Sequence, residues 1–169
     1  MTTRRAFLAS SAALATAAAL PRAALAAAPL NIVATTGMIA DAARRIAGEA
    51  AAVQALMGPG VDPHAYRQTR TDIAAMTRAD LVLWHGLYLE AQLEAFLLDL
   101  ARNRTVVAAA EDLPRDRLLS HEDYDGRFDP HVWMDPRLWT LVATRIAEAL
   151  TEAAPARAAA FAGAQAAYA

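Results

Sequence analysis

The sequence predicts an α/β fold in which a four-stranded parallel sheet is flanked by helices. Two observations predict this fold class. First, short apolar runs alternate along the chain with longer segments of helical period, which is the pattern of βαβ units and a parallel sheet. Second, the 169 residues are 56% hydrophobic and 20% charged, a composition typical of one globular domain with a single core.

Four apolar runs are expected to form the strands, and the periodic segments between them are expected to form helices. The expected strands cover residues 30–35, 52–57, 80–84 and 105–109. The expected helices cover residues 38–48, 69–78 and 90–101. Gly48 lies near the end of the first helix, and Gly58-Pro59-Gly60 closes the second strand, because glycine and proline favour turns.

An acidic loop, residues 111–129, is expected after the fourth strand. The helix that follows the loop carries its apolar residues on one face, namely Leu138, Leu141, Val142, Ile146, Ala149 and Leu150. Residues 155–169 are rich in alanine and stay helical in character to the last residue, with no residue that would cap the helix end. We therefore expect the sequence to be a fragment of a longer protein.

The first 26 residues have the composition of an export signal. Arg4 and Arg5 precede an apolar stretch at residues 9–20, and Ala24-Leu25-Ala26 supplies a small-x-small cleavage site. A membrane anchor is the alternative, but Pro21 and Arg22 interrupt the apolar run before the ~20 residues that a spanning helix needs. We expect a cleaved signal peptide of the twin-arginine type and a periplasmic mature protein.

Charge and cysteine content exclude several classes of function. All 16 basic residues are Arg and the net charge is −2, so the chain has no polycationic surface for nucleic acid. It also has no Cys, which excludes disulfides, thiolate metal sites, cysteine nucleophiles and a lipid-modified N-terminal cysteine. A transition-metal site would therefore have to consist of His, Asp and Glu.

One short motif occurs twice, as Asp62-Pro63-His64 and as Asp129-Pro130-His131. Each copy lies beyond a predicted strand, and the loops that leave the carboxyl ends of parallel strands share one edge of the sheet. Proline restricts the residue before it, so each loop is stiff. Two neutral imidazoles at that edge suit zinc and other first-row divalent metals, and the two aspartates are candidate acceptors that fix the ring tautomers. The alternative is ordinary Asp-Pro turn chemistry.

An enzyme is a second hypothesis from these residues. A metal-dependent hydrolase would use His64 and His131 to hold a metal with an open water position, and it would need a general base, for which Glu90 and Asp135 are candidates. The sequence lacks a phosphate loop, Gly-x-Ser-x-Gly and His-Glu-x-x-His, so the familiar hydrolase motifs are missing. We expect a binding protein.

A series of motifs in fixed order resembles the periplasmic metal-binding receptors (solute-binding proteins) of zinc and manganese ABC importers. The resemblance covers nearly all of residues 30–169, and the segments that carry it are residues 34–42, 56–64, 79–82, 86–90 and 128–133. It implies that His64 and His131 bind Zn²⁺ or Mn²⁺. It also implies that a membrane permease and an ATPase are partners. An adhesin is an alternative role within the same family, but the chain shows no surface anchor.

The resemblance implies a domain organisation as well. Residues 27–153 would form the N-terminal metal-binding lobe, and residues 154–169 would begin a long helix that leads to a second lobe. That second lobe, which is absent from this sequence, would supply two further ligands, a His or Glu and an Asp.

Three further features lie near the expected cleft. His85 ends the third predicted strand, where members of the family more often carry Asn. It is a candidate for a further ligand or for a contact that supports the ligands, but we expect a hydrogen-bonded structural histidine. Trp133 adjoins His131 and is expected to shield the metal from water. The acidic loop carries His121, Glu122, Asp123 and Asp125, a weak candidate for capturing cations. Because the loop is short and has one histidine, the comparison with zinc receptors favours manganese or mixed specificity slightly.

Overall fold

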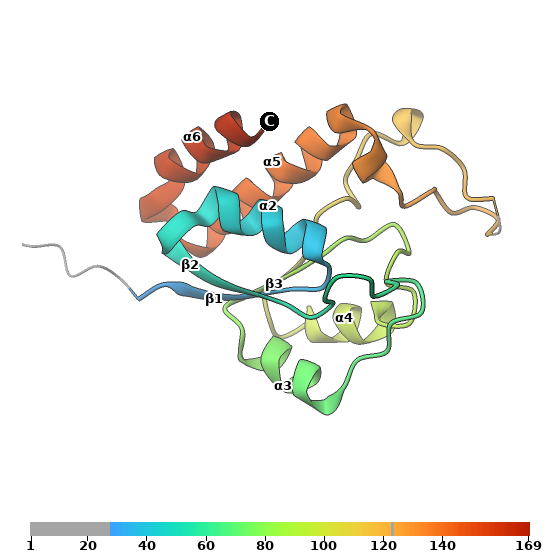
Figure 1. Cartoon of the computed structure of the whole chain (residues 1–169), viewed down its shortest axis with the longest axis horizontal. Coiled ribbons are helices and arrows are strands. Elements are labelled where there is room, and N and C mark those ends of the chain that lie inside the picture. Colours follow the sequence, from blue (N-terminus) through green and yellow to red (C-terminus); the bar gives the residue numbers. More distant parts are fainter. Residues whose placement is uncertain (1–27, 123) are drawn as a thin grey trace, which may run out of the picture.

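The computed structural model describes residues 28–122 and 124–169 of the chain (Figure 1). The expected export signal, residues 1–26, lies outside the described residues, as does Asp123. Among the described helices, none is both long and apolar enough to cross a membrane.

Four parallel strands form one sheet, as the sequence predicts. The strands are β1 (Leu30–Ala34), β2 (Ala51–Ala55), β3 (Leu81–Trp84) and β4 (Val106–Ala108). Their order in the sheet is β2-β1-β3-β4, and every neighbouring pair is parallel. The chain therefore enters at the centre of the sheet, moves to one edge with β2, and returns through β3 to the other edge.

Helices cover both faces of the sheet (Figure 1). On one face lie α2 (Gly37–Ala47), α5 (Pro136–Ala153) and α6 (Ala158–Tyr168), and on the other lie α3 (Arg70–Arg78) and α4 (Glu94–Leu100). Side chains of β1 alternate between the two cores: Ile32 packs with the first group, and Val33 packs with the second. This alternation follows from the two-residue period of a strand.

Helices α2, α3 and α5 begin at residues whose side chains accept backbone N–H groups. Thr36 accepts the N–H of Ile39 at the start of α2, and Asp135 accepts the N–H of Arg137 at the start of α5. Thr69 and Asp72 form a capping box at the start of α3. These contacts satisfy N–H groups that have no partner within the helix, so the loops that precede the helices are fixed.

The prediction that a helix begins at Glu90 is wrong. Residues 87–93 form turns, and α4 begins only at Glu94. Leu87 and Tyr88 have φ angles of +52° and +66°, which no helix contains. Glu90 accepts backbone N–H groups of the preceding turn instead, so its carboxylate stabilises the turn in place of the helix.

The last described residues pack on the lobe. A short 3₁₀ helix, η5 (Pro155–Arg157), leads into α6, which packs against α2 and α5. Phe161 of α6 is almost fully buried, and the Trp139 indole donates a hydrogen bond to the Tyr168 hydroxyl. The proposed start of an inter-lobe helix at residues 154–169 is thus helical, and its connection to a second lobe stays a prediction.

Candidate metal centre

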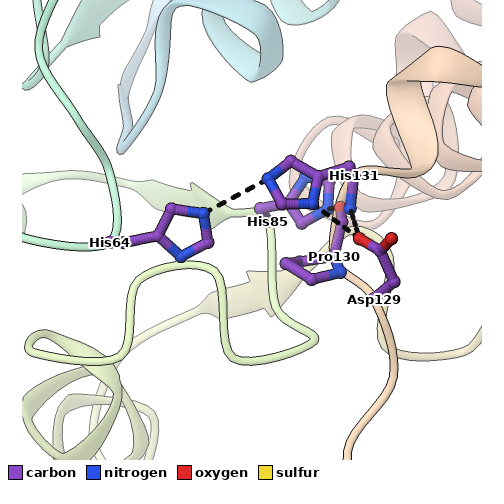
Figure 2. Close-up of polar contacts among 5 residues, drawn as sticks. All are labelled: His64, His85, Asp129, Pro130 and His131. Carbon is purple, nitrogen blue, oxygen red and sulfur yellow. Dashed lines mark hydrogen bonds and ion pairs between the residues drawn. The ribbon is translucent and has the colours of Figure 1, made fainter. Parts of the chain in front are cut away.

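Three histidines lie at the carboxyl edge of the sheet. His64 lies in the connection between β2 and α3, and His85 directly follows β3. His131 directly precedes η4 (Val132–Met134), the 3₁₀ turn before α5. Figure 2 shows His64 and His131 reaching toward each other, with His85 beside His131. The two Asp-Pro-His copies therefore converge, as expected for loops that leave parallel strands.

The repeated motif forms the same turn in both places. Asp62 Oδ1 accepts the backbone N–H of His64 at 2.9 Å, and Asp129 Oδ1 accepts the backbone N–H of His131 at 2.9 Å. An aspartate that caps the N–H two residues ahead closes a local turn. Each imidazole thus leaves its loop from a backbone that is held locally, which reduces the entropy that binding a ligand would cost.

The two imidazoles meet through their Nε2 atoms. These atoms lie 3.3 Å apart, and the ring planes are inclined by 46°. A tetrahedral zinc ion with zinc–nitrogen bonds of about 2.0–2.1 Å requires two ligand nitrogens about 3.3–3.4 Å apart. The observed separation therefore fits two donors to one ion without movement of either loop.

Asp129 fixes the tautomer of His131. Its Oδ1 lies 2.6 Å from Nδ1 of the His131 ring, and burial, which alone would raise the pKa of Asp129, is outweighed by hydrogen bonds from the His131 backbone and ring that lower it. An ionised carboxylate only accepts, so Nδ1 carries the proton and Nε2 of the neutral ring keeps its lone pair. For Asp129, the contact with the His131 ring is the one that the predicted orienting role requires. The bond found for Asp62 is to the His64 backbone.

His85 lies beside His131 and is enclosed by the protein. Its side chain is fully buried, and Nε2 donates to the carbonyl of Pro130 at 2.7 Å. The second ring nitrogen, Nδ1, is buried and has no hydrogen-bond partner among the described residues. Burial lowers the pKa of His85 to about 4, and the hydrogen bond to Pro130 opposes that shift only in part. His85 is therefore a neutral ring near pH 7.

Trp133 contacts both His85 and His131. Its ring meets the His85 ring edge-on with centroids 5.5 Å apart, and it meets the His131 ring edge-on at 5.0 Å. The indole is partly buried, so it covers one side of His131 with an apolar surface. Shielding of a bound metal by this ring stays a prediction.

The two candidate general bases are used elsewhere. Glu90 is 1% exposed, and its carboxylate accepts from the Thr35 hydroxyl at 2.6 Å and from the backbone N–H of His85 at 2.8 Å. Burial raises the pKa of Glu90 despite these bonds. Asp135 accepts the N–H of Arg137 as the N-cap of α5. Neither carboxylate is free to activate a water molecule, which counts against the hydrolase hypothesis.

Sequence reasoning missed the role of Glu90. Its carboxylate ties the end of β1, at Thr35, to the end of β3, at His85 and Gly86. Glu111 holds the same turn from the other side by accepting the N–H of Leu87. An acidic residue directly after the apolar stretch 87–89 was the signal in the sequence, because a carboxylate in an apolar run needs buried donors.

The described residues contain no complete metal site. Among residues 28–122 and 124–169, no group of three or more His, Cys, Asp or Glu side chains is arranged to hold a metal ion. His64 and His131 therefore provide two donors, whereas a structural zinc site has four. In the acidic loop, His121 and Tyr124 rings stack edge-on, and Asp129 is close enough to His121 for its pKa to be lowered further.

Comparisons with known proteins identify the family. The family model "ZnuA: zinc-uptake complex component A periplasmic" matches residues 32–169. The zinc-binding protein TroA of Treponema pallidum is 42% identical over 124 residues, which are 73% of this chain and 40% of that protein. The manganese-binding lipoprotein MntA of Bacillus subtilis is 39% identical over 132 residues, 78% of this chain and 43% of that protein.

Solved structures give the same result. The periplasmic zinc-binding protein TroA from Treponema pallidum superposes with a TM-score of 0.79 at 39% identity, over 83% of this chain and 50% of that chain. Zn(II)-bound AdcA from Streptococcus pneumoniae superposes with a TM-score of 0.74 at 28% identity, over 83% of this chain and 30% of that chain. The chain thus spans half or less of the length of these relatives.

The sequence-based family prediction is confirmed by these matches. The relatives are named as metal-binding proteins and as substrate-binding components of ABC transporters, and not as enzymes, as predicted. With the match to residues 32–169, the chain belongs to the family of the periplasmic zinc-uptake complex component A.

Proposed function

We propose that this chain provides one half of a site that captures Zn²⁺ or Mn²⁺ in the periplasm, with Nε2 of His64 and Nε2 of His131 as ligands. The observation that carries the proposal is the 3.3 Å separation of these two atoms. It is supported by the hydrogen bond of 2.6 Å that His131 Nδ1 donates to Asp129 Oδ1, because the tautomer that this bond selects leaves Nε2 able to bind a metal.

The two remaining donors would come from a second lobe. In the family that the chain belongs to, relatives are more than twice as long as the matched part, which leaves room for such a lobe. Two imidazoles with two further anionic or imidazole donors would close the coordination sphere around zinc. A closed sphere leaves no position for a reacting water, so such a site holds its metal as cargo and does not hydrolyse a substrate.

Delivery to an ABC importer completes the proposed role. Relatives of the chain are named as substrate-binding lipoproteins of metal ABC transporters. We infer a membrane permease and its ATPase as the partners that receive the metal. Export by a cleaved signal peptide at residues 1–26 is part of the same proposal.

Nitrogen NMR of the histidine rings tests the ligand assignment directly. We expect zinc to move the Nε2 resonances of His64 and His131 and to leave those of His85 and His121 in place. His121 is the matched control, since it is a partly exposed imidazole at the same end of the molecule. Zinc-dependent shifts at His121 with none at His64 would refute the proposed site.

A further inference from the structure

His85 connects the rigid sheet to the loop that carries His131. Its backbone continues β3, where its N–H donates to Glu90 Oε1 at 2.8 Å and its carbonyl accepts the N–H of Ala110 at 2.8 Å. Both backbone groups of His85 are thus fixed within the sheet edge. The imidazole then reaches across 45 positions of sequence to the Pro130 carbonyl.

The peptide group between Pro130 and His131 is held at both ends. Its carbonyl accepts His85 Nε2 at 2.7 Å, and its N–H donates to Asp129 Oδ1 at 2.9 Å. The same carbonyl also accepts the N–H of Val132 at 2.8 Å. Since this peptide plane sets the direction in which the His131 side chain leaves the backbone, a change in its orientation would move Nε2 away from His64.

The contact of His85 with the loop is local to the proposed site. Pro130 is buried and its nitrogen cannot donate, so the carbonyl is the group by which the sheet can hold this residue through a hydrogen bond. The Trp133 ring packs edge-on against both His85 and His131 and fills the space beside them. His85 is not placed as a third ligand, because no group of three candidate donors is found among the described residues.

We propose that His85 is a positioning residue for metal capture: its hydrogen bond to the Pro130 carbonyl holds His131 in the orientation that places the two Nε2 atoms on one ion. This inference rests on the proposed function, since it assumes that His131 is a ligand. His85 would then contribute to metal affinity in addition to packing in the core at the edge of the sheet.

Two substitutions separate positioning from stability. His85→Phe keeps an aromatic ring of similar size but removes the donor, and His85→Gln keeps an N–H donor at a similar distance from the backbone. We expect His85→Phe to raise the zinc dissociation constant roughly tenfold or more, which is the usual effect of removing a group that orients a metal ligand. His85→Gln should recover most of the lost affinity. Affinities are measured by competition with a chromophoric chelator on protein shown to be folded.

Leu97→Ala is the control for loss of stability. Leu97 is fully buried in the core on the opposite side of the sheet from α2, and it belongs to the cluster around α3 and α4. Its truncation lowers stability without touching the Pro130 carbonyl, so zinc affinity should stay within about twofold of the unsubstituted protein. Equal losses in Leu97→Ala and His85→Phe would overturn the positioning role.

Two further measurements do not depend on whether the His85 variants fold. In the unsubstituted protein, ring NMR must show the proton of His85 on Nε2, and a proton on Nδ1 would contradict the hydrogen bond on which the inference depends. His131→Ala distinguishes the two levels of the proposal. If it leaves zinc affinity unchanged, the proposed function fails; if it weakens affinity while His85→Phe does not, only the positioning role fails.

Discussion

His64 and His131 are 67 residues apart in the sequence, and their Nε2 atoms lie 3.3 Å apart at the carboxyl edge of the sheet. Each ring is presented by an Asp-Pro-His turn whose aspartate caps the N–H of the histidine. The fold therefore brings two copies of one local structure into contact. Their separation matches that of two nitrogens on one tetrahedral ion, and this match leads to the predictions that follow.

Asp129→Asn should weaken zinc binding by roughly 10- to 100-fold, because the amide neither fixes the His131 tautomer with certainty nor supplies charge to the ring. Asp62→Asn is the matched control. Its carboxylate contacts the backbone of His64, so we expect a smaller change. Zinc competition titrations of the two variants check this. Equal effects would show that the contact of Asp129 with the His131 ring has no special importance.

Acid should destabilise the protein through His85. Burial lowers the pKa of His85 from 6.5 to about 4, so between these values the unfolded chain binds a proton that the folded protein does not. The free energy of unfolding should therefore fall by about 1.4 kcal/mol per pH unit as the pH drops through this window. His85→Gln, which does not titrate, should lack this part of the slope. Urea unfolding from pH 7 to pH 4 measures both, and parallel curves would contradict the prediction.

Removing the Glu90 carboxylate should destabilise the sheet edge. Glu90→Ala leaves the buried N–H groups of His85 and Gly86 and the Thr35 hydroxyl without their acceptor. Because an unsatisfied buried donor costs about 1–3 kcal/mol, we expect a loss of about 3 kcal/mol or more in the free energy of unfolding. Thr35→Val removes one of these donors and should cost about 1 kcal/mol. A loss under about 1 kcal/mol in Glu90→Ala would show that the turn is held by other contacts.

The isolated chain should hold zinc poorly. Two imidazoles supply half of the donors that zinc prefers, and removing donors weakens binding by orders of magnitude. We expect zinc to be lost when the chain is dialysed against a modest chelator and then assayed by atomic absorption. One equivalent of zinc retained through dialysis would mean that the described residues provide more donors than the His64 and His131 pair.

Much of the fold could be predicted from the sequence because it depends on local patterns. The four strands follow from short apolar runs, and the end of α2 follows from Gly48, because glycine favours a helix end. The convergence of the two Asp-Pro-His motifs also followed, since it needs only the rule that the carboxyl ends of parallel strands share one edge.

The contacts that support the site could not be predicted in the same way. The helix expected from Glu90 begins only at Glu94, and the Glu90 carboxylate instead accepts from the N–H groups of His85 and Gly86 and from the hydroxyl of the distant Thr35. The partner of His85 is the carbonyl of Pro130, which no sequence pattern identifies. Buried polar contacts between distant segments are tertiary interactions, and hydrophobic periodicity does not report them.

Calorimetric titration of zinc and manganese into the full-length protein, which includes the second lobe that the proposed function requires, tests the central claim most directly. The variants are His64→Ala and His131→Ala, with His121→Ala as the control for the loss of an imidazole outside the two Asp-Pro-His motifs. We predict one metal ion per chain, with binding strongly weakened by either of the first two substitutions and unchanged by the third. Binding that survives both His64→Ala and His131→Ala would contradict the account and would reduce the Asp-Pro-His pair to turn structure.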